Sequence, residues 1–472
     1  MIRNALACIG LAWCNMAAAA TLDLEQLLVA IEEHRRAHQV AGVGLTIVSA
    51  EQVLWTGGFG VNDWGKREPV GADTLFRIGS ITKVFTAATL LALEHEGRLR
   101  LDDPVRRYIP NPPYRNDWER TAPVTVAQLL EHTAGFQDLT KAEFDHSDAT
   151  PLTLEQGFAI RPDAHVTRWK PGLHAVYSNF GYGVAGLVIE RVAGERYEDQ
   201  VTARLLAPLG MSSSGFFLDD VSGARLATGY DTDGRTPIRY WHMIFRPFGG
   251  INSTPRDMGA LVQLLLNRGR HRGHQVLPAE SVERMETPRT SLAARSGLTF
   301  GYGLGVTQSY RRGVLFHGHG GDGDGYLAHF GYSRESGLGY FVVINAFNHD
   351  ALRAMRAEIE RAIVRTLPPR NAVPAVQVPI DTLRRYVGDY ELAAWRFPWT
   401  TPEQAHDAGL RVLMIDGVLH TQASDGTRTA LIPVTERHFR REDEPAATCA
   451  FVEDEDGELY FEEDESYRLR RH

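Results

Sequence analysis

The chain has 472 residues, 43% of them hydrophobic and 23% charged, which is the composition of an ordinary globular protein with room for two or three domains. Fifty basic residues against 59 acidic ones give a formal net charge of −9, so binding of nucleic acid through a basic face is not expected. Beyond the first twenty or so residues, no apolar run is long enough to span a membrane.

The N-terminus has the pattern of a secretory signal peptide. Arg3 supplies a positive charge, residues 5–13 are apolar, and the alanines at 17–20 offer a small-residue cleavage site. Residues 1–20 are therefore predicted to be removed on export to the periplasm or the medium, which leaves no transmembrane segment. A lipid anchor on Cys14 is the alternative. Only Cys449 then remains, so neither an internal disulfide nor a cysteine zinc site is expected.

Residues 21–367 are expected to form one domain whose elements run in the order strands, helices, strands and helix. Residues 22–40 have helical periodicity, and residues 43–48 and 53–55 form an expected strand pair. Further helices are predicted at 80–96, 126–131, 180–192 and 197–206, followed by a hairpin of residues 326–332 and 338–345 and a closing helix over 352–363. This order predicts an α+β fold, in which an antiparallel sheet built from both ends of the domain is flanked by helices and carries an inserted helical region.

A second, smaller unit is predicted after a linker. Residues 368–379 contain four prolines and no periodicity, which is typical of a linker. Residues 380–472 are then expected to form a small all-β, barrel-like module. Its predicted strands are residues 386–392, 411–415, 418–422, 429–433 and 458–462.

The residues that carry chemistry begin with a Ser-x-x-Lys motif, Ser80 and Lys83, at the predicted start of a helix. Three residues apart on a helix, the hydroxyl and the amine share one face, and the free N–H groups of the helix N-terminus favour an attacking oxygen. The chain has only three other lysines, and Lys, unlike Arg, can lose its proton when it is buried. The alternative is an N-capping serine with a surface lysine.

A second motif, Tyr177-Ser178-Asn179, precedes the predicted helix at residue 180. A nearby ammonium would lower the pKa of the Tyr177 phenol from about 10, so that Tyr177 and Lys83 could share the proton of Ser80. Asn179 would donate a hydrogen bond near Lys83 or to a substrate carbonyl. The alternative is a helix cap with a packed aromatic ring.

A third motif, residues 317–325, is rich in glycine and contains His317, His319, Gly321 and Asp322. Glycines at this density allow close approach to the backbone, whose N–H groups could complete an oxyanion hole opposite Ser80. Two alternatives remain open: a metal site that uses His317 and His319, for which no further spaced ligands are found, and a plain glycine loop with solvated histidines.

These three motifs, in this order, resemble those of the serine β-lactamase and penicillin-binding-protein family, specifically its class C-like branch, which includes D-aminopeptidases and esterases. The resemblance covers residues from about 25 to 365 and matches Ser80 and Lys83, Tyr177 and Asn179, and His319-Gly320-Gly321. It implies that Ser80 forms an acyl-enzyme, with the oxyanion between the N–H groups of Ser80 and Asp322. It leaves open whether Lys83 or Tyr177 is the base in acylation.

One departure from the family's pattern bears on the substrate. His319 stands where β-lactamases and D,D-peptidases have a lysine that helps to hold the substrate carboxylate, and histidine is largely neutral at pH 7. We therefore expect a serine hydrolase acting on a small amide, ester or D-amino-acid peptide, with no cofactor and no metal. A catalytically weak penicillin-binding or ligand-binding sensor is the alternative. Specificity is expected from the loops 138–168 and 230–247; the oligomeric state is not predicted.

Overall fold

The computed structural model describes residues 21–144, 150–217, 225–370, 373–463 and 466–470. The predicted signal peptide lies outside these residues. Among the helices that are described, none combines the length and the apolar content needed to cross a bilayer.

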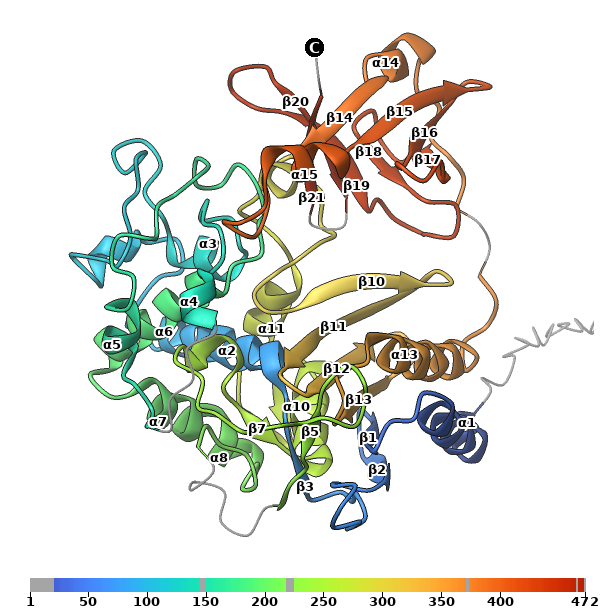
Figure 1. Ribbon diagram of the computed structural model, residues 1–472. Coiled ribbons are helices and arrows are strands. Elements are labelled where there is room, and N and C mark those ends of the chain that lie inside the picture. Colours follow the sequence, from blue (N-terminus) through green and yellow to red (C-terminus); the bar gives the residue numbers. More distant parts are fainter. Residues whose placement is uncertain (1–20, 145–149, 218–224, 371–372, 464–465, 471–472) are drawn as a thin grey trace, which may run out of the picture.

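The centre of the main domain is a six-stranded antiparallel sheet of strand order β10-β11-β12-β13-β1-β2 (Figure 1). Strand β1 pairs with β13 in a register that places Thr46 opposite Phe341, so the two ends of the domain meet in the middle of the sheet. The predicted antiparallel sheet built from both ends is confirmed. The strands are β1 Gly42–Ser49, β2 Val53–Gly60, β10 Thr307–Arg311, β11 Val314–Gly323, β12 Tyr326–Ser333 and β13 Leu338–Ile344.

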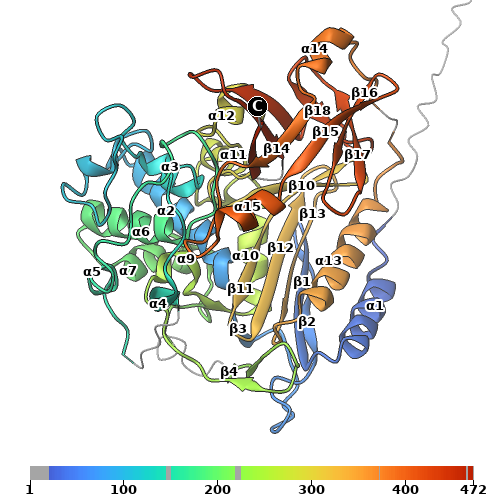
Figure 2. The ribbon, with the colours of Figure 1, turned by 45° about the horizontal axis from the view of Figure 1, so that its top comes forward.

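Helices cover both faces of this sheet. Helix α1 (Leu24–Ala37) and helix α13 (His349–Val364) lie together on one face, where they bury the alternate side chains Val43, Leu45 and Ile47 of β1 (Figure 2). Helix α10 (Pro255–Leu266) packs on the other face, so closely that a Cβ on Gly44 would lie 2.7 Å from Cγ of Pro255. Because β1 is buried on both faces, its sequence is almost continuously apolar.

The inserted helical region lies beside the sheet. Its two long buried helices are α2 (Thr82–His95) and α6 (Asn179–Ala193), both of which were predicted from periodicity. The shorter helices are α3 Val126–Leu130, α4 Lys141–Phe144, α5 Leu154–Phe158, α7 Tyr197–Val201, α8 Ala207–Leu209, α9 Arg246–Gly249, α11 Ala279–Glu286 and α12 Leu292–Arg295, with single turns η1 Gly79–Ile81, η2 Val105–Arg107 and η3 Thr202–Leu206. Short strands complete it: β3 Thr74–Arg77, β4 Arg225–Leu226, β5 Gly229–Tyr230, β6 Pro237–Ile238, β7 Asn252–Ser253, β8 Arg270–His271 and β9 His274–Gln275.

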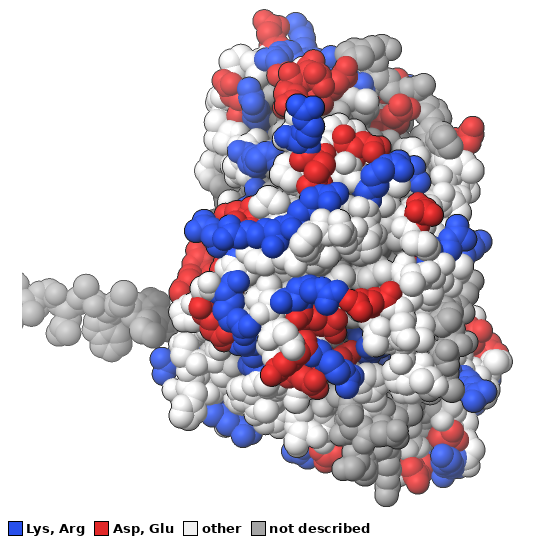
Figure 3. Space-filling view, turned by 90° about the vertical axis from the view of Figure 1, so that its left-hand side faces the viewer, with Lys and Arg blue, Asp and Glu red and all other residues white. Residues whose placement is uncertain are grey.

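The outer face of this helical region carries basic and acidic side chains that are interspersed (Figure 3). On this face the net charge of −9 is therefore not gathered into one broad patch of a single sign.

The C-terminal module is a closed barrel of eight strands in sequence order, with β14 pairing to β21. Its interior is filled by side chains, including Tyr386 and Phe451, whose rings stack with their centres 4.2 Å apart. A separate apolar cluster joins residues near α12 of the main domain to β19 and β20 of the barrel. The elements are α14 Ile380–Arg384, β14 Gly388–Leu392, α15 Pro402–Asp407, β15 Leu410–Ile415, β16 Val418–Gln422, β17 Arg428–Pro433, β18 His438–Arg440, β19 Cys449–Glu453, β20 Leu459–Glu463 and β21 Ser466–Arg470.

Candidate active site

Ser80 lies in a single 3₁₀ turn, η1, between the buried strand β3 and helix α2. The predicted helix begins at Thr82 rather than at Ser80, and the tighter turn still places Lys83 on the same side as Ser80. Strand β11 lies directly against this turn, since a Cβ on Gly321 would be 1.9 Å from the carbonyl oxygen of Ile78. The serine is therefore held between the start of a helix and the edge of the sheet.

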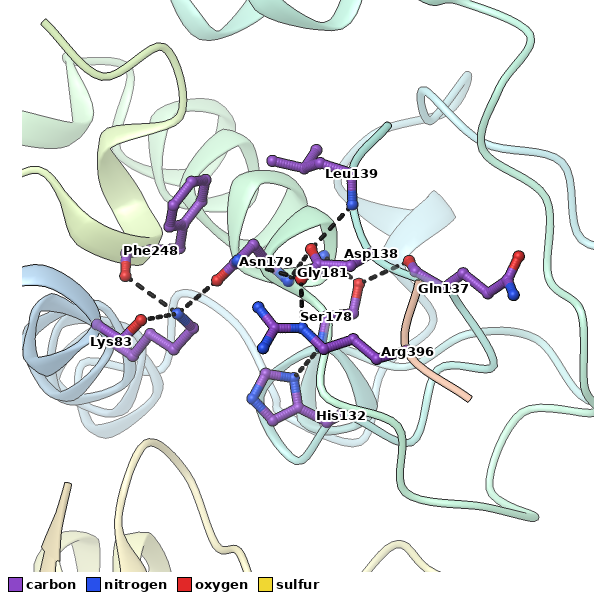
Figure 4. A network of polar contacts seen from close by, with 11 residues as sticks. Lys83, His132, Gln137, Asp138, Leu139, Ser178, Asn179, Gly181, Phe248 and Arg396 are labelled. Carbon is purple, nitrogen blue, oxygen red and sulfur yellow. Dashed lines mark hydrogen bonds and ion pairs between the residues drawn. The ribbon is translucent and has the colours of Figure 1, made fainter. Parts of the chain in front are cut away.

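The Lys83 amine is fully buried and makes three contacts. Its Nζ lies 3.0 Å from Oγ of Ser80, 2.7 Å from Oδ1 of Asn179 and 3.1 Å from the carbonyl oxygen of Phe248 (Figure 4). Burial lowers the pKa of this amine well below its usual value; Asp138 opposes that shift, and Arg396 adds to it. The lysine is not at the surface, so the alternative of a surface lysine is wrong.

Asn179 is held in one orientation by Asp138. The backbone N of Asn179 donates to Oδ1 of Asp138 at 2.7 Å, and its Nδ2 donates to Oδ2 at 3.2 Å, which leaves Oδ1 to accept from Lys83. Ser178 is the N-cap residue of α6, so the helix-cap interpretation of this motif is also correct. The amide faces Lys83, but it accepts from the amine rather than donating to it.

The Tyr177 ring lies over the buried amine of Lys83. Its centre is 4.8 Å from Nζ of Lys83, 4.3 Å from the ring centre of His132 and 4.6 Å from the guanidinium carbon of Arg396. Tyr177 also lines the cavity that contains Ser80. The structure therefore brings together Ser80, Lys83, Tyr177 and Asn179.

The third motif is a strand rather than a loop. Residues 317–323 belong to β11, which corrects the glycine-loop interpretation. Pairing of β10 with β11 ends at Gly318, so the edge of β11 from His319 onward faces the turn that carries Ser80. Extended glycines allow this approach because no side chains intervene.

His319 is buried and neutral. Burial and the neighbouring Lys83 lower the pKa of its imidazole to about 3. The Tyr302 hydroxyl lies 2.9 Å from Nε2, while Nδ1 lies beside the carbonyl oxygen of Gly320. This pairing fits an imidazole that donates from Nδ1 and accepts at Nε2. No group of three His, Cys, Asp or Glu side chains able to hold a metal ion is found among the described residues, His317 and His319 included.

These residues open into a cavity of about 670 Å³. Both loops that were expected to set specificity contribute to this cavity, residues 138–168 through Glu143 and residues 230–247 through Trp241. Besides the predicted Ser80, Tyr177, Asn179, His319 and Asp322, its lining includes Arg77, Glu143, Trp241, Met243, Ile244, Phe245, Phe248, Asp324, Phe347 and Arg396.

Two charged residues that act on Lys83, Asp138 and Arg396, were not predicted from the sequence. Asp138 carries no motif, and it was noted only as the start of a loop. Arg396 lies in the C-terminal module, and nothing in its local sequence indicates that the barrel reaches the cavity. Both are recognised only through their contacts in the folded chain.

Comparison with known proteins agrees with this geometry. The beta-lactamase family model matches residues 28–365. The chain belongs to the beta-lactamase family. The family match covers the sheet and the helical region and ends before the barrel.

Relatives of known structure share the fold. The octameric penicillin-binding protein homologue from Pyrococcus abyssi is 25% identical, with a TM-score of 0.62 over 95% of this chain and 100% of the other. A D-stereospecific amidohydrolase from Streptomyces sp. is 27% identical, with a TM-score of 0.54 over 70% of this chain and 98% of the other.

A curated relative, protein flp of Staphylococcus aureus, is 30% identical over 222 residues, which is 46% of this chain and 43% of that protein. The chain therefore spans less than half the length of this relative.

Proposed function

We propose that this protein is a serine hydrolase of the beta-lactamase family that works through an acyl-enzyme on Ser80. The observation that carries the proposal is the set of contacts at Nζ of Lys83. Two of its three partners, Oδ1 of Asn179 and the carbonyl oxygen of Phe248, can only accept hydrogen bonds. In the ammonium form, Nζ donates to all three partners, including Oγ of Ser80 at 3.0 Å. In the neutral form, its two N–H groups would serve Asn179 and Phe248, and its lone pair would turn to Oγ of Ser80.

This arrangement supports Lys83 as the base in acylation. Burial lowers the pKa of the amine, so a larger fraction is unprotonated near neutral pH than for a solvated lysine. Loss of the hydroxyl proton to the amine as the Ser80 oxygen attacks a carbonyl carbon would give a tetrahedral intermediate and a Lys83 ammonium. That ammonium would return the proton to the leaving group. Tyr177, which lies over the amine, would help to exclude water from it.

The open edge of β11 supports an oxyanion site. The backbone N–H groups of Ser80 and Asp322 would hold the developing negative charge, because β11 approaches η1 so closely that a Cβ on Gly79 would be 2.7 Å from the nitrogen of Asp322.

The substrates we propose are small amides and esters, including those of D-amino acids. The D-stereospecific amidohydrolase from Streptomyces is among the structural relatives. His319 is neutral and does not supply the cation that a lysine would at this position, although Arg77 and Arg396 also line the cavity. We also propose export to the periplasm or the medium, on the leader pattern of residues 1–20. The mass of the chain purified from its native host tests this point.

Intact-mass spectrometry with a panel of acylating compounds tests the proposed function. The panel is a fluorophosphonate, a short-chain ester, a D-amino-acid amide, a D-Ala-D-Ala peptide and a cephalosporin. One adduct per chain is expected, and Ser80→Ala abolishes it, whereas Ser336→Ala, in the turn between β12 and β13, does not. Equal labelling of Ser80→Ala would refute the assignment. Adducts that form without turnover on every compound would instead favour the ligand-binding alternative.

A further inference from the structure

Among the described residues of the C-terminal module, Arg396 is the one that lines the candidate active-site cavity. Arg396 lies between β14 and α15, and its carbonyl oxygen accepts a hydrogen bond of 2.8 Å from the backbone N of Asp138. Its Nε donates to Oδ2 of the same aspartate at 2.8 Å (Figure 4). The two modules are therefore joined at this point by both backbone and side chain.

Asp138 is the carboxylate that orients Asn179 beside Lys83. Its side chain is completely buried, so without a partner it would be a negative charge removed from water. Arg396 is the cation that pairs with it. A continuous chain of contacts thus runs from Arg396 through Asp138 and Asn179 to Lys83.

The charges along this chain act on Lys83 in opposite directions. The carboxylate of Asp138 raises the pKa of the Lys83 amine, and the guanidinium of Arg396 lowers it. If Arg396 were absent, the buried carboxylate would favour the ammonium form, which has no lone pair for the proton of Ser80.

Other groups around Lys83 do not replace this cation. Asp322 is a second carboxylate that favours the ammonium. Burial lowers the pKa of His132 well below its usual value and that of His319 to about 3, so neither adds a positive charge near neutral pH. The rings of Tyr177 and Tyr182 lie 4.8 and 5.4 Å from Nζ, and aromatic faces attract a cation.

We propose that Arg396 is a positioning residue that the barrel module supplies to the hydrolase site, where it neutralises Asp138 and so keeps the Lys83 amine free to accept the proton of Ser80. This inference rests on the proposed function. It also gives the barrel module a role. The interior of the barrel is filled by side chains, and the module contributes to the site from its surface, through Arg396.

The test is the pH dependence of kcat/KM for a neutral short-chain ester, measured on the full chain. In wild type, kcat/KM is expected to fall at low pH, on the acidic limb of the profile. Arg396→Gln is expected to move this limb upward by about one pH unit, so that kcat/KM is about tenfold lower on the limb and recovers at higher pH. The loss is expected in kcat rather than in KM, because an uncharged ester has no group for the guanidinium to bind. Arg396→Lys keeps a cation and is expected to leave the limb near its wild-type position.

The matched control is Lys170→Gln. Lys170 forms another ion pair between the main domain and the barrel, with Glu455, but it lines a different cavity. This variant is expected to leave the limb unchanged. If it moved the limb as far as Arg396→Gln does, loss of module docking would explain both effects and the proposal would be wrong.

Two further outcomes would overturn the proposal. One is an Arg396→Gln profile lowered equally at every pH, which would indicate a structural or substrate contact. The other concerns the double variant Asp138→Asn/Arg396→Gln, which also decides the matter if Arg396→Gln does not fold. The acidic limb of the double variant's kcat/KM profile is expected at or below the pH of the wild-type limb, since both charges are removed. An acidic limb at a higher pH than in wild type contradicts the inference. Failure of the Ser80 assignment is recognised separately, because wild-type chain would then carry no adduct on Ser80.

Discussion

Gly79 and Asp322 are in such close contact that a Cβ on Gly79 would lie 2.5 Å from the carbonyl oxygen of Asp322. Gly79 also has a φ of +52°, in the left-handed region that glycine tolerates best. The contact sets the distance between the turn that carries Ser80 and the edge of β11.

Gly79→Ala is expected to displace β11 from Ser80. A shift of about 1 Å in reacting groups can lower the rate by about 100-fold. The variant should therefore be labelled by a fluorophosphonate far more slowly than wild type. Gly97→Ala is the control, because Gly97 has a similar φ of +72° but open space around its Cβ position. Equal labelling rates for the two variants would show that the contact does not position the site.

Lys83→Met is expected to lower the acylation rate by about 100- to 10,000-fold, the usual contribution of a general base. Lys83→Arg should lose about as much, because a guanidinium keeps its proton. Stopped-flow labelling of Ser80 measures both rates. Lys66→Met, at an exposed lysine, should label at the wild-type rate. An active Lys83→Met variant would transfer the role of base to another group, Tyr177 first.

His319→Gln is expected to lower the rate without moving the acidic limb of the pH profile. The pKa of His319 is about 3, so this imidazole is neutral throughout the range from pH 5 to 8 and its removal takes away no titrating group there. Profiles of kcat/KM for wild type and His319→Gln measured over this range should have the same shape. Disappearance of a limb near pH 6.5 in the variant would show that His319 titrates during the reaction.

His174→Phe is expected to reduce the acid sensitivity of the fold. Burial lowers the pKa of His174 to about 4, and its ring lies 5.0 Å from that of Tyr460 in the barrel. Below pH 6.5 the unfolded chain binds a proton that the folded chain does not, so stability falls as the pH decreases from 6.5 towards 4. Between pH 7 and pH 5 this histidine should cost about 2 kcal/mol of unfolding free energy.

Denaturant unfolding of wild type and His174→Phe at the two pH values measures this difference. His349→Phe, at an exposed histidine, is the control and should behave as wild type. If His174→Phe loses as much stability between pH 7 and pH 5 as wild type does, the acid sensitivity arises elsewhere in the chain.

Much of the main domain could be predicted because its signals are local or periodic, but strands β10 and β11 and helix α10 were not predicted. Apolar spacing indicated α2, α6 and the β12–β13 hairpin, since each buries one face or a continuous core run. The barrel was predicted less completely. Strand β18 has only three residues, too few for a period-2 pattern, and β19 and β21 were also missed although they are as long as β14 and β16. Strands of a closed sheet are stabilised by their neighbours as well as by their own sequence.

The sequence by itself determined that a hydroxyl and an amine lie three residues apart at the start of a helix, because helical geometry alone brings Ser80 and Lys83 to one side. Only the tertiary structure decided what surrounds that pair. Asp138 and Arg396 are 258 residues apart, and no periodicity or motif couples residues so distant. Their charges act together on Lys83 because the barrel docks on the main domain and brings Nε of Arg396 to 2.8 Å from the buried Asp138 carboxylate.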